Sequence, residues 1–200
     1  MGTGSPERLP LLHPDTLTAE QREVYEALVG GPRGGGSAFS MIDDEGCLLG
    51  PYNAMLYSPA VGMTLQALGA AVRYRTSFSP REREIAILVV ASYWRSEYVW
   101  FAHERVGRAV GLSDSELVSL RADKHIAFED KRERVIYKAA ISLTRVGDLG
   151  DTMYSEAKSV LSEADLAEMV VLVGYYATLA LLMRAFRVGV PDGEAVPRWG

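Results

Sequence analysis

The chain has little cysteine, no cluster of basic residues and few histidines. Cys47 is the only cysteine, which excludes an internal disulfide or a thiolate metal cage within one chain and suits a reducing cytoplasm. The 21 basic and 26 acidic residues are spread along the sequence with a formal net charge of -5, so phosphate-driven binding of nucleic acid has no support. The strongly apolar run from Met169 to Met183 is shorter than the roughly 20 residues of a membrane-spanning helix. We therefore expect a buried helix there and no membrane partner.

The length and composition predict one domain. Of the 200 residues, 48% are hydrophobic, which is enough to bury one substantial core. We expect a flexible N-terminal tail over residues 1–10, a single domain over 11–190 and a C-terminal tail over 191–200. Within the domain, the segment from Gly30 to Gly36 contains five glycines and one proline and is expected to be a surface loop.

Helix starts recur along the chain, whereas strand signals are scarce. In five places Ser, Thr or Asp precedes Glu, Gln or Asp by three positions, a spacing that caps a helix N-terminus reciprocally. The five pairs are Thr18 with Gln21, Ser79 with Glu82, Ser113 with Glu116, Asp130 with Glu133, and Ser162 with Asp165. The pattern predicts an all-α fold.

Apolar spacing predicts further helices over residues 52–57 and 61–73, and the second of these places Leu65, Leu68 and Val72 on one face. The last helix, about residues 163–188, is apolar over most of its circumference. Such a helix must be covered by protein on nearly all sides, which favours self-association over a monomer.

His103 is the most suggestive titratable residue. It follows an aromatic-rich stretch and lies one helical turn from Trp100 and two from Ser96. An imidazole beside an apolar wall suits proton transfer, although a hydrogen-bonded structural histidine fits the same pattern. His13 and His125 have polar neighbours and are expected at the surface. Three scattered histidines make a poor metal site, so no metal is predicted.

Glu84 belongs to a charged helix start but immediately precedes an apolar run. A solvated carboxylate and a carboxylate at the edge of a core are both consistent with that position. On one straight helix, Glu84 and His103 would be separated by about 28 Å. A joint role therefore requires a chain reversal, and we predict a helix break around residues 94–96, with Ser96 capping the second helix.

Other candidates have weaker patterns. Ser96 lies about 10 Å from His103 along one helix and lacks a nucleophile-elbow motif, so a serine hydrolase is disfavoured. Tyr175 and Tyr176 can supply a hydroxyl to a pocket, but they are equally consistent with core packing. Arg184 can supply a cation, or simply stabilise the end of its helix.

Several short motifs, in order, resemble the carboxymuconolactone decarboxylase and alkylhydroperoxidase D-like family. The motifs are Ser79 to Leu88 (SPREREIAIL), Glu97 to Trp100 followed by His103, Arg8 to Pro10 with Glu20 to Tyr25, Gly50 to Asn53 with Ser58 and Pro59, and Gly174 to Tyr176. Together they extend over residues 8–190.

The resemblance implies an all-α domain that assembles as trimers or hexamers, with a pocket near subunit contacts. It implies that Glu84 and His103 are catalytic and that no bound cofactor is needed. Six further residues are expected to bind substrate: Asn53, Ser96, Tyr98, Trp100, Tyr175 and Arg184, the last standing where relatives tend to carry asparagine.

The chain departs from redox members of that family, which carry a Cys-x-x-Cys pair. Ser96 and Val99 stand at the two cysteine positions, so disulfide exchange lacks its nucleophile. The leading expectation is an acid–base enzyme, a decarboxylase, isomerase or related lyase, acting on a small organic acid or lactone. One alternative is a non-catalytic ligand-binding or scaffold protein. Another is a peroxidase-type oxidoreductase acting through Cys47.

Overall fold

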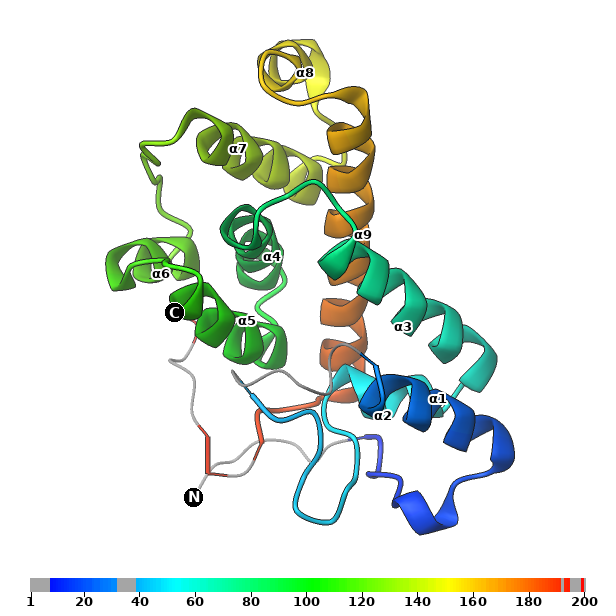
Figure 1. Cartoon of the computed structure of the whole chain (residues 1–200). Helices are drawn as coiled ribbons and strands as arrows, with labels where there is room; N and C mark the ends of the chain where they lie inside the picture. The colour runs from blue at the N-terminus through cyan, green and yellow to red at the C-terminus, as the bar shows by residue number, and fades with distance from the viewer. Residues whose placement is uncertain (1–7, 32–38, 192, 195–198, 200) are drawn as a thin grey trace.

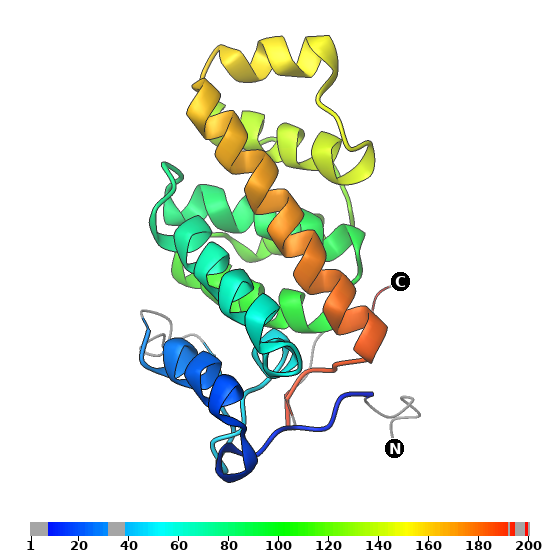
Figure 2. The same cartoon turned by 90° about the vertical axis from the view of Figure 1, so that its right-hand side faces the viewer.

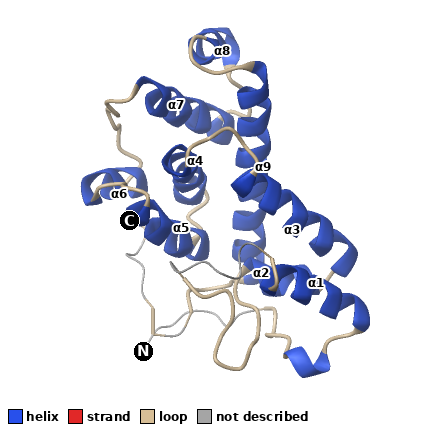
Figure 3. Ribbon diagram, in the orientation of Figure 1, coloured by secondary structure: helices blue, strands red, loops and turns tan. Residues whose placement is uncertain are grey.

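The computed structural model describes residues 8–31, 39–191, 193, 194 and 199, and this part of the chain is helical (Figure 3). Its only β-type pairing is an isolated bridge between Ile42 and Leu48. The elements are the 3₁₀ helix η1 (Pro14–Thr16) and the α-helices α1 (Ala19–Val29), α2 (Pro51–Leu56), α3 (Pro59–Tyr74), α4 (Pro80–Tyr93), α5 (Glu97–Ala109), α6 (Asp114–Arg121), α7 (Lys131–Arg145), α8 (Gly150–Lys158) and α9 (Glu163–Phe186). The predicted all-α fold is confirmed. Residues 1–7 of the expected N-terminal tail and 32–36 of the expected glycine loop lie outside the described residues.

The predicted helix starts are confirmed. Thr18, Ser79, Ser113 and Ser162 form complete capping boxes at the starts of α1, α4, α6 and α9. Asp130 accepts hydrogen bonds from the amides of Arg132 and Glu133 at the start of α7. The carboxylate of Glu133 turns to Arg81 instead of closing the box. Local side-chain chemistry therefore determines where most of the long helices begin.

Two helices, α4 and α9, organise the core (Figure 1). α4 packs against α5, α6, α7 and α9, and α9 also contacts α2, α3, α5 and α7. In Figure 2, α9 runs diagonally across the front of the other helices. By length and composition alone α9 could cross a membrane, but half of its most apolar stretch is buried in the domain, as in a core helix.

The predicted apolar face of α3 is wrong in part. Leu68 is 40% exposed, whereas Gly62, Gly69 and Val72 are the buried positions of this helix. Gly62 lies so close to α2 that an added Cβ would be 2.1 Å from the carbonyl oxygen of Met55. The close approach of two backbones therefore selects the glycine side of α3 as its inner face.

Candidate active site

Glu84 lies inside the protein although it belongs to a charged helix start. The capping box begins α4, and the apolar residues that follow pack this helix between its neighbours. The first turns of α4 are drawn inward with them, and Glu84 is only 1% exposed. A carboxylate at this depth requires charged or hydrogen-bonding partners.

The chain reverses between α4 and α5, and the predicted break is confirmed. α4 ends at Tyr93, Arg95 adopts a left-handed φ of 48°, and α5 begins at Glu97. Ser96 occupies the predicted N-cap position, but its side chain makes no capping bond. Its amide donates to the carbonyl of Ala91 at 3.0 Å, which ties the turn to α4.

The reversal brings His103 to Glu84. His103 Nδ1 lies 2.6 Å from Glu84 Oε2, and His103 is 8% exposed. A carboxylate on Nδ1 fixes the orientation of the imidazole. This arrangement leaves Nε2 as the ring nitrogen that can exchange a proton with a ligand.

Arg73 and Tyr176 complete the surroundings of this pair. Arg73 Nη1, from the end of α3, lies 3.6 Å from the second carboxylate oxygen, Glu84 Oε1. The ring of Tyr176 meets that of His103 edge to face, with centroids 4.9 Å apart. Burial, followed by the charge of Glu84, raises the pKa of Tyr176, so its hydroxyl stays protonated and can only donate or accept a hydrogen bond.

A cavity of about 60 Å³, here called the inner cavity, opens against His103. Side chains of α2, α3, α5 and α9 form its wall. The lining residues are Phe39, Pro51, Tyr52, Arg73, Tyr74, Tyr98, Val99, Ala102, His103, Tyr175, Tyr176 and Leu179. Aromatic rings surround an imidazole and a guanidinium there, and charge–charge interactions are stronger in such a partly buried place than in water.

The structure brings together only some of the sequence-predicted residues. Tyr98 and Tyr175 line the inner cavity with His103. Ser96, Trp100 and Arg184 are not part of its wall. Trp100 is fully buried, with its ring edge-to-face with that of Trp199.

Arg184 and Asn53 have structural partners. Arg184 is exposed and donates to the carbonyl of Trp94 at 2.5 Å, so it holds the turn between α4 and α5. The amide side chain of Asn53 accepts from the Leu12 amide and donates to the Pro10 carbonyl, each at 3.1 Å. Asn53 thereby fastens the N-terminal segment to α2.

Arg73 was not found from the sequence. A basic residue near the end of a helix is expected from the helix dipole alone, so its position carries no functional signal. The signal comes from tertiary packing, which sets the C-terminal end of α3 beside the buried Glu84.

A second cavity, here called the outer cavity, has a volume of about 510 Å³. The N-terminal segment, the loop before α2, the start of α5 and the segment after α9 surround it. Tyr98 and Phe39 line both cavities, so the two adjoin. Asn53 lies on the wall of the outer cavity.

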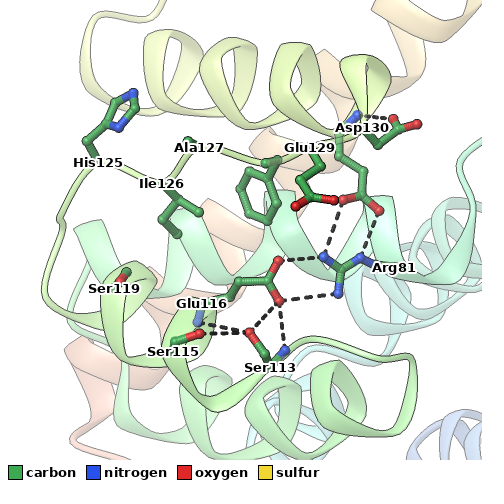
Figure 4. A pocket seen from close by; sticks show the side chains of 12 residues that line it. Arg81, Ser113, Ser115, Glu116, Ser119, His125, Ile126, Ala127, Glu129 and Asp130 are labelled. Atoms are coloured by element: carbon green, nitrogen blue, oxygen red, sulfur yellow. Dashed lines mark hydrogen bonds and ion pairs between the residues drawn. The ribbon is translucent and has the colours of Figure 1, made fainter.

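A third cavity, of about 670 Å³, lies between α6 and the segment that enters α7 (Figure 4). Arg81 lies at its edge and bonds to Glu116 at 2.6 Å and Glu133 at 2.8 Å, as well as to the carbonyl of Gly111. His125, on this wall, is exposed, as predicted. Because the cation is already shared by two carboxylates, this cluster joins α4, α6 and α7 and has no cation left for a ligand.

Cys47 is buried and lies on neither the inner nor the outer cavity. Burial, together with the charges of Asp43 and Glu45, raises the pKa of its thiol, which disfavours the reactive thiolate. Within the described ranges, no three His, Cys, Asp or Glu side chains group as metal ligands would.

No protein-family model matches the chain, and no curated protein matches it. Solved structures do. A peroxidase-related protein from Ralstonia eutropha with the alkylhydroperoxidase AhpD core has a TM-score of 0.74 at 11% identity, covering 94% of both chains. A peroxidase-related protein from Silicibacter sp. has a TM-score of 0.73 at 18% identity, covering 96% of both. A protein of unknown function from Agrobacterium tumefaciens, provisionally named an AhpD antioxidant defence protein, has a TM-score of 0.63 at 18% identity, covering 70% of this chain and 96% of its own.

At these identities the likeness concerns the fold. Two of these structures match over 94% or more of both chains with TM-scores above 0.7. The chain therefore has the all-α fold of the AhpD-like proteins.

Proposed function

We propose that this chain is a cofactor-independent acid–base enzyme, a decarboxylase, isomerase or related lyase, that acts on a small organic acid or lactone. The observation that carries the proposal is that His103 lines the inner cavity while its Nδ1 lies 2.6 Å from Oε2 of Glu84, which is buried behind it. A positioned imidazole whose far nitrogen is held by a carboxylate is the arrangement that general acid–base catalysis uses.

The electrostatics of this region favour an anionic substrate. Arg73 lines the inner cavity, and Arg83 lies close to Glu84 on α4. Burial, together with the like charge of Arg73, lowers the pKa of Arg83 against the opposing effect of Glu84. Two guanidinium groups beside one carboxylate leave an excess of positive charge that a carboxylate or enolate oxygen can neutralise.

These groups can perform two related reactions. In a decarboxylation, the bond between the carboxylate carbon and its neighbour breaks, carbon dioxide leaves, and the electron pair stays on a carbon conjugated to a carbonyl. Protonated His103 then donates its Nε2 proton to that carbon. In an isomerisation, neutral Nε2 removes a proton from carbon and returns it to another position, while Arg73 stabilises the enolate.

The test is product formation from a panel of small carboxylic acids, lactones and enones, with wild type, His103→Gln and His125→Gln compared. His125 is an exposed histidine remote from the pair and serves as the matched control. We expect turnover by wild type and His125→Gln and a fall of about 10²- to 10⁴-fold in kcat for His103→Gln. Binding without turnover by any of the three proteins would instead support a non-catalytic binding protein.

Peroxide reduction has less support, although two of the solved neighbours are named peroxidase-related. The positions of a Cys-x-x-Cys pair hold Ser96 and Val99, and the raised pKa of Cys47 disfavours a thiolate. If Cys47 acted on peroxide, Cys47→Ser would abolish peroxide consumption, and we expect no change.

We also propose that the chain self-associates, as a trimer or hexamer, through α9. Val170, Val171 and Leu181 on this helix are 50%, 44% and 48% exposed, and Gly174 between them has open space around it. The uncharged stripe that they form along α9 is typical of a surface covered by another subunit.

A further inference from the structure

The inner cavity has room only for a small acid or for the acid group of a larger one. At about 10–15 Å³ for each water-sized group, 60 Å³ holds roughly four to six such groups. The outer cavity, at about 510 Å³, falls within the usual range of small-molecule sites. Because Tyr98 and Phe39 line both, a larger ligand that reaches His103 must extend into the outer cavity.

The walls of the outer cavity suit an apolar body. Leu11, Leu49, Phe101 and Val190 belong to its lining. Arg105, its only cation among the described lining residues, is occupied, since it pairs with Glu194 at 2.6 Å and lies 3.9 Å from the centroid of the Phe101 ring.

The charges of the outer cavity oppose those of the inner cavity. Asp43 and Asp44 line the outer cavity together with Glu194, so its described lining has three carboxylates and one guanidinium. The inner cavity has Arg73 on its wall, and although Arg73 lies 3.6 Å from Glu84, Arg83 close by leaves two guanidinium groups to one carboxylate. An anionic head is therefore favoured beside Arg73 and disfavoured in the outer cavity, which orients an amphipathic acid with its head inward.

Tyr98 marks the boundary between the two cavities. Its ring packs against Gly50, where an added Cβ would lie 2.1 Å from Tyr98 Cζ. Its hydroxyl is buried and has no hydrogen-bond partner among the described residues, and the residue is 2% exposed. A ligand oxygen at the boundary would satisfy this orphaned group.

We propose that the outer cavity binds the uncharged apolar body of the substrate, with the acid group beside Arg73 and an oxygen of the ligand on the Tyr98 hydroxyl. The inference rests on the proposed function, because that function makes the inner cavity the reacting site. It narrows the substrate class from small organic acids in general to acids with an extended apolar chain or ring.

The probes are straight-chain carboxylates with two to ten carbons, and their binding is measured by calorimetry. Burying one methylene contributes about 0.8 kcal/mol, so the dissociation constant should fall about fourfold for each added carbon until the outer cavity is filled. Leu11→Trp and Val190→Trp place bulk in the outer cavity at positions that are not fully buried. Val118→Trp, on the exposed face of α6, is the matched control.

We expect the fourfold steps in wild type and in Val118→Trp, and their loss in the two filling variants, with butanoate binding kept within about threefold. Equal steps in all four proteins, or no measurable binding of any acid, would overturn the inference. If the dissociation constant falls stepwise with chain length but no panel compound is converted, the proposed function is refuted and the outer binding site is still supported. If small acids are converted but the dissociation constant does not fall with chain length, only the outer binding site is refuted.

Discussion

His103 and Glu84, nineteen positions apart in sequence, are in contact through Nδ1 and Oε2 at 2.6 Å. On one continuous helix they would lie about 28 Å apart. The left-handed Arg95 and the hydrogen bond from Ser96 to Ala91 make the turn that joins them. The geometry of this turn is therefore a requirement for any chemistry that uses both residues.

Glu84→Gln should lower kcat by about 10²- to 10⁴-fold on any compound that wild type converts. The amide keeps the size of the side chain but carries no charge, so it cannot offset positive charge that develops on the imidazole during the reaction. Steady-state kinetics with circular dichroism of the folded variant measures this. An unchanged kcat would show that the pair is structural.

Arg73→Gln should weaken the binding of an acid substrate about 10- to 100-fold, because it removes a hydrogen bond between charged groups. Arg184→Gln, on α9, is the matched control for Arg73→Gln, on α3. The guanidinium of Arg184 already donates to Trp94 from an exposed position, so we expect no change in KM. A loss of affinity in Arg184→Gln alone would assign the anion contact to α9 instead of α3.

Tyr98→Phe should leave the free energy of unfolding unchanged or raise it by up to about 1 kcal/mol, because it removes a buried hydroxyl that no described residue partners. Tyr137→Phe is a matched contrast, since the hydroxyl of Tyr137 donates to the Lys124 carbonyl at 3.1 Å. We expect Tyr137→Phe to cost about 1 kcal/mol. Urea denaturation of both variants measures the difference, and an equal loss in both would mean that Tyr98 is bonded in solution.

Features determined by neighbouring residues were predictable from the sequence. The capping boxes and the position of the α4–α5 break follow from short motifs. The reach of a helix showed only that a joint role of Glu84 and His103 needs a chain reversal, and their shared pocket was implied by the family resemblance. Tyr98 and Tyr175 on the inner cavity are also residues chosen from the sequence.

Features that depend on which helix faces came together were not predictable. Leu68 is exposed because α3 turns Gly62 toward α2, a choice that apolar periodicity does not encode. Arg73 reaches Glu84 from another helix. The direction of the Trp100 ring, toward Trp199 instead of the inner cavity, likewise depends on distant residues.

Protonation of Asp165 should lower the free energy of unfolding in acid. Burial would raise its pKa, but hydrogen bonds from Ser77, the Ser162 amide and Arg132 outweigh burial and lower it to about 2 from the ordinary 3.8. Stabilisation of about 2 kcal/mol is therefore complete above roughly pH 4 and is lost as the pH falls toward 2.

Urea denaturation at pH 5 and pH 2 tests this contribution. From pH 5 to pH 2, wild type should lose about 2 kcal/mol more unfolding free energy than Asp165→Asn, whose side chain cannot titrate. The loss in Ser77→Ala should lie between those of wild type and Asp165→Asn. Identical losses in wild type and Asp165→Asn would contradict the assignment.

Val171→Glu and Leu181→Glu should shift the protein toward the 21.9 kDa monomer in light scattering if α9 is covered by another subunit. A charge placed on a desolvated contact lacks a partner and costs several kcal/mol in the assembly, whereas on an exposed monomer surface it costs little. Val118→Glu, on α6 and 65% exposed, is the control and should keep the wild-type mass.

Because α9 also supplies Tyr175 and Tyr176 to the inner cavity, the monomeric variants separate two roles of this helix, subunit contact and formation of the site. Retained turnover in a monomer would mean that one chain holds a complete site, while loss of turnover together with assembly would mean that the neighbouring subunit supports it.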